Sequence, residues 1–324
     1  MKNLNQKNES VTIMLKLVGT SCNMKCQYCY GHVSNVKHIG CVDEEVVVEY
    51  LSQYKDVRHV FIVFHGGEPL LMGKKTMSVI MKYITENFTG EYHIQIQTNG
   101  ILINEEWIKL FEKFAPVVSV SISLDPEGKK DLRFGNDYEL RKKVFHNIKK
   151  VSDRIDNVGV ISVIHAYNIC GVNDFVRQLI EIGIRSLTIN KCQAEKKDKY
   201  YITEMQYVDL LKQVFIEWVS NRWYKDINIQ PLVSLFSKNK NKLCVYLDDE
   251  NKCTYFRTFY NENDKSNFCD HLSEKEIPRV QNKCIKCEIY KMCGGGCLAE
   301  EKDETFCEAR KELFEFIEEV KNGN

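Results

Sequence analysis

Alternation between apolar β-type runs and helical stretches is the feature that most constrains how this chain folds. Apolar residues at three- and four-residue steps predict helices over 43–55, 74–88, 104–114, 137–153 and 171–182. The runs between them predict six strands, at 12–19, 60–66, 92–100, 117–125, 158–166 and 186–191. Strands that alternate with helices pair in parallel through right-handed crossovers. The pattern therefore predicts an α/β fold, and six such units suit an open, partial (β/α) barrel.

Length and charge narrow the functional class. The 324 residues are enough for one large core and a smaller appended unit. Lys plus Arg (45) equals Asp plus Glu (45), so the charge gives no reason to expect binding to nucleic acid or to an anionic membrane. The N-terminus is polar and no apolar stretch is long enough to span a membrane, so we expect neither a signal peptide nor a span. A cytoplasmic location is the expectation that follows.

The domain organisation is predicted from a change of pattern near residue 200. A strong amphipathic helix covers 203–222, and the alternation of strands and helices ends before it. We assign 1–200 to the barrel, and 201–324 to a linker helix with a cysteine-rich extension. Within the barrel, Asp43 and Asn104 precede helical runs and are predicted helix N-caps.

Three cysteines near the N-terminus, Cys22, Cys26 and Cys29, form a CxxxCxxC run on a predicted loop after the first strand. Three thiolates supplied to a four-iron cluster leave one iron without a protein ligand, open to a substrate or cofactor. A ferredoxin-type cluster with four cysteines has no such open position and only transfers electrons. The alternative is a zinc site completed by His32 and His38, since zinc takes four ligands.

Polar residues follow the predicted strands at their carboxyl ends, where barrels of this kind gather ligands. After the second strand come Gly66, Gly67, Glu68 and Pro69. Two glycines let the backbone approach a ligand closely and offer free amide and carbonyl groups, although an ordinary tight turn has the same composition. The third strand ends in the run Gln97 to Gly100, for which an Asn-Gly turn is the alternative. The fourth strand ends in Ser123 and Asp125, and Arg133 follows.

The remaining cysteines gather near the C-terminus. Of fourteen in total, eight lie between 244 and 307, which in a reducing compartment argues for metal ligation and against disulfides. Eight cysteines saturate two four-iron clusters, and a double zinc ribbon is the alternative because CxxC pairs also suit zinc. Three other cysteines stand apart and are predicted to be small buried hydrophobic side chains: Cys41, Cys170 and Cys192.

These cysteine runs resemble those of a known superfamily. The N-terminal loop, with the aromatic Tyr28 before its third cysteine, resembles the cluster loop of radical S-adenosylmethionine (SAM) enzymes. The run CX2CX5CX3C from Cys284, followed by Cys307, resembles the SPASM extension of their peptide- and protein-modifying members. The resemblance covers about residues 12 to 310 and implies a partial (β/α)6 TIM-like barrel with a C-terminal SPASM extension. It also implies SAM and three [4Fe-4S] clusters, one SAM-binding and two auxiliary.

The same resemblance assigns residues to SAM. The GGEP run matches the motif whose backbone holds the amino group of SAM's methionine moiety, and QTNG matches an element of sulfatase-maturase-like enzymes. Ser123 and Arg133 match SAM contacts in anaerobic sulfatase maturases, and Leu187 matches a leucine of the adenine pocket. The alternatives are a solvated arginine and an ordinary core leucine. The predicted cofactor-binding residues are Tyr28, Gly66, Gly67, Glu68, Gln97, Asn99, Ser123, Arg133 and Leu187.

By resemblance, the C-terminal cysteines divide into two ligand sets. Cys244, Cys253, Cys269 and Cys297 would hold auxiliary cluster I, and Cys284, Cys287, Cys293 and Cys307 would hold auxiliary cluster II. Asp270 matches an aspartate that accepts a proton from the substrate Cys or Ser in anaerobic sulfatase maturases, and a carboxylate beside a cluster suits that task. A helix cap or a solvated side chain is the alternative for Asp270, and His271 is a second candidate base.

Three features depart from the sulfatase maturases. The loop after the fourth strand reads SLDPEG where they read SLDGP or SMDGP. Asp264 stands where they have a glycine, and only fourteen residues separate Cys269 from Cys284, where they carry a longer insert. The last two changes lie beside the expected substrate pocket and make the substrate the open question.

Together these patterns predict a radical SAM/SPASM oxidoreductase that cleaves SAM to a 5′-deoxyadenosyl radical. It would oxidise a side chain or backbone carbon of a ribosomally synthesised peptide, forming a thioether or a carbon–carbon crosslink. An anaerobic sulfatase maturase that forms formylglycine from Cys or Ser is the alternative. A non-catalytic iron–sulfur electron-transfer protein is a remote third, with no use for an open iron. The expected partners are a peptide or protein substrate and a one-electron reductant of flavodoxin or ferredoxin type, with no nucleic acid and no membrane.

Overall fold

A single curved sheet forms the centre of the molecule. This computed structural model describes residues 10–29, 42–236, 256–261, 263–266, 284, 286–293, 295–297 and 301–323. Within these residues the sheet has nine strands in the order β7-β6-β5-β4-β3-β2-β1-β8-β9. Strands β1 to β8 are parallel, and β9 pairs antiparallel to β8. Their bounds are Ser10–Leu15, His59–Phe64, Glu91–Thr98, Val118–Ser123, Val158–Ile164, Ser186–Lys191, Asn228–Gln230, Phe256–Asn261 and Asp264–Ser266.

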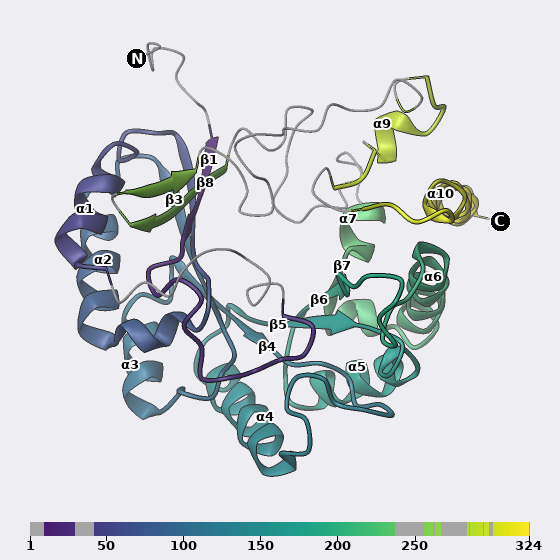
Figure 1. The fold of residues 1–324 in the computed structure, drawn as a ribbon, viewed down its shortest axis with the longest axis horizontal. Coiled ribbons are helices and arrows are strands. Elements are labelled where there is room, and N and C mark those ends of the chain that lie inside the picture. The colour runs from purple at the N-terminus through teal and green to yellow at the C-terminus, as the bar shows by residue number, and fades with distance from the viewer. Residues whose placement is uncertain are drawn as a thin grey trace.

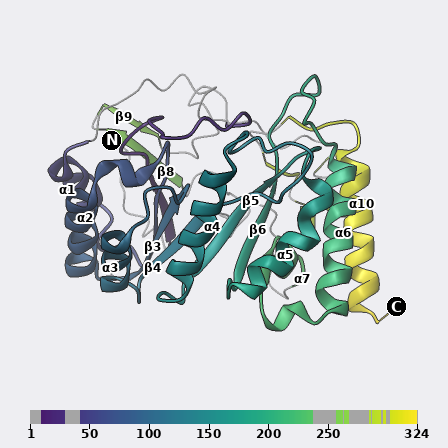
Figure 2. The same cartoon turned by 90° about the horizontal axis from the view of Figure 1, so that it is seen from below.

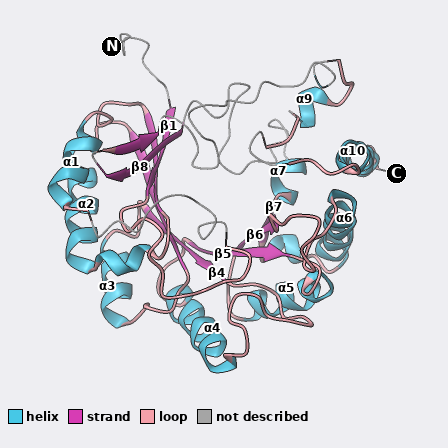
Figure 3. Ribbon diagram, viewed as in Figure 1, coloured by secondary structure: helices cyan, strands magenta, loops and turns pink. Residues whose placement is uncertain are grey.

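Helices cover the outside of this arc of strands (Figure 1; Figure 3). The first six are α1 (Glu44–Ser52), α2 (Lys74–Asn87), α3 (Glu105–Lys113), α4 (Tyr138–Ser152), α5 (Val172–Glu181) and α6 (Glu204–Ser220). The C-terminal part adds α7 (Leu232–Phe236), α9 (Tyr290–Cys293) and α10 (Phe306–Lys321), and α10 lies beside α6 (Figure 1; Figure 2). Short 3-10 turns occupy Pro69–Met72, Ile169–Gly171 and Trp223–Lys225. No described helix is both long and apolar enough to cross a membrane.

Side-chain caps fix where several helices begin. The Asp43 side chain accepts from the Glu45 amide, and the Asn104 side chain accepts from the Glu106 and Trp107 amides, so both predicted caps are confirmed. Helix α6 begins with a capping box, in which the Thr203 and Gln206 side chains each satisfy the other residue's amide. Such caps occupy amides that have no partner inside the helix.

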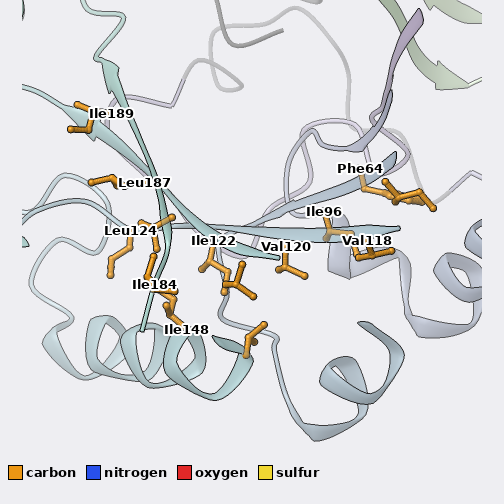
Figure 4. Close-up of a cluster of buried hydrophobic side chains, with 14 of the residues drawn as sticks. Phe64, Ile96, Val118, Val120, Ile122, Leu124, Ile148, Ile184, Leu187 and Ile189 are labelled. Carbon is orange, nitrogen blue, oxygen red and sulfur yellow. The ribbon is translucent and has the colours of Figure 1, made fainter. Parts of the chain in front are cut away.

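The core lies between the arc and the helices. Figure 4 shows part of it, where side chains of β4, β6 and α4 meet; Val120, Leu187 and Ile148 are almost completely buried. Parallel strands covered by helices read as nearly continuous apolar runs, which is why the sequence pattern identified them.

The six predicted strands and the helices between them are confirmed, with ends shifted by a few residues. The sequence did not predict β7, β8 or β9. Strands β7 and β8 come after residue 200 and join the barrel sheet at β6 and β1, while the predicted domain boundary stays a prediction. Of the isolated cysteines, Cys192 is buried as predicted, the prediction for Cys170 is wrong because it is exposed, and Cys41 lies outside the described residues.

Candidate active site

The polar residues that follow the first four strands lie along one edge of the sheet. The register pairs Leu15 with Phe64, Phe64 with Ile96, and Thr98 with Ile122, so the carboxyl ends of these strands are level. Residues 16–29, here called the thiol loop, follow β1 and carry Cys22, Cys26 and Cys29. In Figure 2 this purple segment passes over that edge. The structure thus brings the thiol loop to the strand ends where the sequence placed the site.

The two glycines after β2 pack directly against the thiol loop. The Gly67 amide donates to the Gly19 carbonyl (2.8 Å), and the Glu68 amide donates to the Ser21 carbonyl (2.7 Å). A Cβ atom on Gly67 would lie 1.8 Å from the Ser21 oxygen, which no side chain tolerates. The expectation of a free glycine amide is therefore wrong for Gly67. Glycine is required here because two segments of backbone meet.

Glu68 is a fully buried carboxylate whose two oxygens are both occupied. Its Oε1 accepts from the Leu70 amide (3.0 Å) and from the Thr98 hydroxyl (2.7 Å), and its Oε2 accepts from the Asn99 amide (2.7 Å). Burial raises the pKa of Glu68, against the effect of these three hydrogen bonds. The carboxylate thus connects the turn after β2 to the end of β3, and the structure gives it a positioning role at the rim.

Asn99 continues this connection to the cysteines. Its side-chain amide donates to Asn23 Oδ1 (2.7 Å) and lies 3.6 Å from Cys22 Sγ. Its side-chain Oδ1 accepts from the Ile101 amide (3.0 Å). Hydrogen bonds therefore connect Glu68 to Asn99 and Asn99 to Asn23, which precedes Met24 and follows the first cysteine, Cys22. Gln97, two residues before Asn99, is partly buried on β3 and has interactions of its own.

Asp125 anchors the other side of the thiol loop. This carboxylate is 2% exposed and accepts from the Tyr28 hydroxyl, from Arg133 Nε (3.1 Å) and Nη2 (3.2 Å), and from the Val163 amide (2.9 Å). The Arg133 guanidinium also lies 5.6 Å from the centre of the Tyr28 ring. Its side chain is 8% exposed, which contradicts the alternative of a solvated surface arginine.

The surroundings of Arg133 and Tyr28 keep the guanidinium charged and the phenol neutral. Burial alone would lower the pKa of Arg133, but Asp125 and neighbouring groups hold it well above its ordinary value. Burial raises the pKa of Tyr28 well above 10, so its phenol stays a neutral donor to Asp125. A second arginine stabilises the loop after β4 that contains Asp125. Arg141 Nη2 donates to the Asp125 backbone carbonyl (2.8 Å), and Arg141 Nη1 pairs with Asp131 (3.1 Å).

A cavity of about 220 Å³ lies between the thiol loop and the segment that leads into α4. Its lining includes Asn23, Lys25 and Gln27 from the loop and Arg133 and Asp137 from the other side. The Gln27 amide donates to the Leu132 carbonyl (2.8 Å) at the base of this contact. The cavity therefore adjoins the thiol loop and the buried Arg133.

The three cysteines of the thiol loop form no disulfide and could hold a metal group. Cys22 is exposed and Cys26 and Cys29 are partly buried. Burial raises the pKa of Cys26 to about 11, with Asp125 and the other two thiols adding to the shift and Arg133 opposing it. A thiol with such a pKa is protonated at neutral pH until a metal displaces the proton. Among the described residues no three His, Cys, Asp or Glu side chains converge on a single-ion site, whereas the cysteines of an iron–sulfur cluster bind separate irons.

The Cys284 and Cys307 thiols lie within electrostatic range of the Cys293 thiol. The pKa of Cys293 is raised first by burial and further by the neighbouring Cys284 and Cys307 thiols. The Cys287 amide donates to the Cys284 carbonyl (3.0 Å), so the fourth member of this predicted set is adjacent. Cys297 lies four residues beyond Cys293, and its carbonyl accepts from Lys302 (3.2 Å).

Several predicted residues lie outside the described part of the chain, among them Cys244, Cys253, Cys269, Asp270, His271, His32 and His38. Ser123 is partly buried at the last position of β4. Leu187 is fully buried in the hydrophobic core (Figure 4), as the core alternative expects.

Sequence reasoning missed three residues of the rim. Asp125 and Thr98 were noted beside predicted strand ends but were not assigned to the site. His165 follows β5, is 1% exposed, and its ring centre lies 5.8 Å from that of Tyr28. Each is a polar residue at or directly after the end of an apolar strand run. This position in the sequence is enough to indicate a residue of the site.

Comparison with known families agrees with this geometry. A family model described as the radical SAM superfamily matches residues 17–179, which include the three cysteines of the thiol loop and the ends of β2 to β5. The chain is 23% identical over 372 residues to the cysteine-type anaerobic sulfatase-maturating enzyme of Clostridium novyi (strain NT), covering 95% of each. It is 22% identical over 337 residues to the serine-type enzyme of Klebsiella aerogenes, covering 89% of this chain and 79% of that one.

Solved structures share the fold. Native anSMEcpe with bound AdoMet has a TM-score of 0.77 and 21% identity, covering 97% of this chain and 100% of that one. Streptococcus suis SuiB bound to the precursor peptide SuiA has a TM-score of 0.64 and 17% identity, covering 92% of this chain and 76% of that one. At these identities the likeness concerns the fold: an open barrel of parallel strands followed by a C-terminal region.

Proposed function

The chain belongs to the radical SAM superfamily, and from that premise we propose that it oxidatively modifies a peptide or protein substrate. The observation that carries the proposal is the double anchoring of the thiol loop. Glu68 and Asn99 hold it from one side, and Asp125 and Arg133 hold it from the other. Such anchoring fixes the backbone of the loop and leaves its thiols for a metal group.

The cysteines and the polar groups at the strand ends fit the cofactors of the superfamily. Cys22, Cys26 and Cys29 would hold the [4Fe-4S] cluster that binds SAM. The amides of Gly67 and Glu68 are occupied, so this turn would meet SAM through carbonyl groups. Ser123 and Arg133, at and after the end of β4, suit a carboxylate ligand, because a guanidinium and a hydroxyl are both donors. When bound and reduced, these cofactors supply a 5′-deoxyadenosyl radical that removes a hydrogen atom from the substrate.

The residues of the chain position the cofactors and exclude water. Tyr28 covers the Arg133 guanidinium and, as a neutral phenol, donates to Asp125. Asp125 keeps the guanidinium charged and oriented. A reactive radical requires such a rigid and dry environment, and the protein's contribution to cofactor chemistry of this kind is orientation and exclusion.

The substrate class follows from the relatives. Both kinds of sulfatase-maturating enzyme act on proteins by name, and SuiB has been solved with a precursor peptide. We propose a ribosomally synthesised peptide as the substrate and a thioether or carbon–carbon crosslink as the product. The departures SLDPEG, Asp264 and the short Cys269–Cys284 segment support this choice over sulfatase maturation.

Formylglycine formation from Cys or Ser is the second candidate. It is favoured by the coverage of 95% of the Clostridium novyi enzyme and by the QTNG and CDH runs. Asp270 would then accept the proton of the substrate Cys or Ser. In either case the C-terminal cysteines would hold auxiliary clusters, whose chemistry is electron transfer.

One experiment separates these candidates. Reduced, reconstituted protein is incubated with SAM and two peptides: one encoded beside this chain in its genome, and one carrying a sulfatase Cys or Ser motif. Mass spectrometry locates the modified residue, and reaction with a hydrazine identifies an aldehyde. We expect a crosslink in the first peptide. An aldehyde in the second, with the first unchanged, would contradict the crosslinking proposal and support the second candidate.

A further inference from the structure

Arg310, on α10, is a buried cation with unused hydrogen-bond donors. Its side chain is 9% exposed, and its Nη2 atom pairs with Glu204. Its Nε and Nη1 atoms are buried and have no acceptor among the described residues. Buried donors in folded proteins nearly always have partners, so two orphaned donors on one guanidinium indicate a missing acceptor.

An aromatic ring, a carboxylate and cysteines surround the Arg310 guanidinium. The guanidinium carbon is 5.1 Å from the centre of the Phe306 ring, which occupies one side. Glu204 occupies another and also pairs with Lys191 (3.1 Å). The positive charge of Arg310 acts on Cys293, and Cys307 precedes Arg310 by three residues on the same helix. Residues three apart on a helix are neighbours on its surface.

The glycine turn after Cys293 packs against the same aromatic ring. A Cβ atom on Gly296 would lie 2.5 Å from Phe306 Cζ, so the turn between Cys293 and Cys297 packs on the ring that Arg310 covers. The glycine turn, the aromatic ring and the guanidinium therefore pack together, and this turn joins Cys293 to Cys297.

We propose that Arg310 donates hydrogen bonds through Nε and Nη1 to sulfur atoms of the cluster held by Cys284, Cys287, Cys293 and Cys307. This role rests on the proposed function, because it requires that these cysteines hold a cluster. A cluster with four thiolates is anionic, and hydrogen bonds to its sulfurs raise its reduction potential. Arg310 thus acts as a positioning residue that favours the reduced form of this auxiliary cluster.

The test is a redox titration of the auxiliary clusters, followed by electron paramagnetic resonance, in the full-length reconstituted protein. We expect Arg310→Met to lower one midpoint potential by about 59 mV, which corresponds to a tenfold change in the reduced-to-oxidised ratio of a one-electron couple. Arg310→Lys keeps the charge and one donor group and should recover part of the shift. Lys321→Met is the matched control, since Lys321 is 33% exposed and pairs with Glu318 at the far end of the same helix.

A second readout separates hydrogen bonding from general structural effects. In wild-type protein, electron–nuclear double resonance should detect exchangeable protons coupled to one auxiliary cluster, and exchange into D2O should remove them. Wild-type clusters without such protons would overturn the role of Arg310, even where Arg310→Met fails to fold. An unchanged potential in folded Arg310→Met would also overturn it. Wild-type protein with iron for the SAM-binding cluster alone would instead contradict the cluster assignment, and the Arg310 role with it.

Discussion

Asp125 connects three segments that lie far apart in the chain. Tyr28 of the thiol loop, Arg133 of the loop before α4 and the Val163 amide of β5 all donate to this one buried carboxylate. Its position after the apolar run SISL was evident in the sequence. The partners were not, because they come from segments up to 97 residues away.

Replacing Asp125 tests this connection. We expect Asp125→Asn to lower the free energy of unfolding by about 3–5 kcal/mol, because it leaves the Arg133 guanidinium buried without a countercharge. Urea unfolding of matched preparations measures the loss. Asp153→Asn removes an exposed carboxylate that pairs with Lys149 on the same helix, and should cost about 0.5 kcal/mol or less. Equal losses in the two variants would contradict the assigned role of Asp125.

For Glu68, the sequence predicts the turn but not the hydrogen-bond partners of the side chain. The GGEP run indicated a special turn, and the structure confirms that a glycine is required at position 67. The sequence could not show that the Glu68 carboxylate accepts hydrogen bonds from two backbone amides and a hydroxyl of the same chain. Those donors include Asn99, 31 residues later, and their approach depends on how β2 and β3 pair.

At the scale of elements, local signals fix most of the barrel. β-Branched strands, apolar helix faces and capping residues such as Asp43 and Asn104 are short-range features, and each agrees with the structure. Strand β8 could not be predicted in the same way. It is as long as β1, with six residues each, but it becomes a barrel strand because Phe256 pairs with Thr12, a contact across 244 positions of the chain.

The turn after β2 provides an element-scale prediction. We expect Gly67→Ala to displace the thiol loop, because its methyl group would overlap the Ser21 carbonyl. Reconstituted Gly67→Ala should retain at least tenfold less iron at the SAM-binding site, as measured by iron content and cluster spectra. Gly73→Ala is the control. Its φ of +87° makes alanine strained at this position, but nothing lies within 4 Å of the added atom. Full cluster content in Gly67→Ala would refute the packing argument.

At the scale of the whole molecule, Asp303 joins the C-terminal helix to the barrel. It accepts from the Tyr201 hydroxyl (2.8 Å) and the Glu204 amide (2.8 Å), and it pairs with Lys191 of β6 (3.4 Å). Burial alone would raise the pKa of Asp303, but hydrogen bonds from Thr305, Tyr201 and the Glu204 amide, with the charge of Lys191, lower it from 3.8 to about 2. This junction was not predicted from sequence, since its members are dispersed over more than one element.

The sign of that shift gives a pH prediction. A lowered pKa stabilises the fold above pH 3.8, and this contribution is lost as the pH falls towards 2. We therefore expect Asp303→Asn to lower the free energy of unfolding by about 2 kcal/mol at pH 7. The difference from wild type should stay constant between about pH 5 and 8 and shrink below about pH 4. Denaturant unfolding across this range measures it, and a difference that vanishes at about pH 6 would contradict the assignment.

The most direct test of the proposed chemistry is the formation of 5′-deoxyadenosine from SAM. Protein reconstituted with iron and sulfide without oxygen is reduced with dithionite, and the product is quantified by chromatography. We predict turnover in the wild type, none in Cys26→Ala, and wild-type rates in Cys170→Ala, which removes an exposed cysteine outside the thiol loop. Undiminished 5′-deoxyadenosine formation by Cys26→Ala, or none by a wild-type protein that holds its full iron content, would contradict the assignment of the thiol loop.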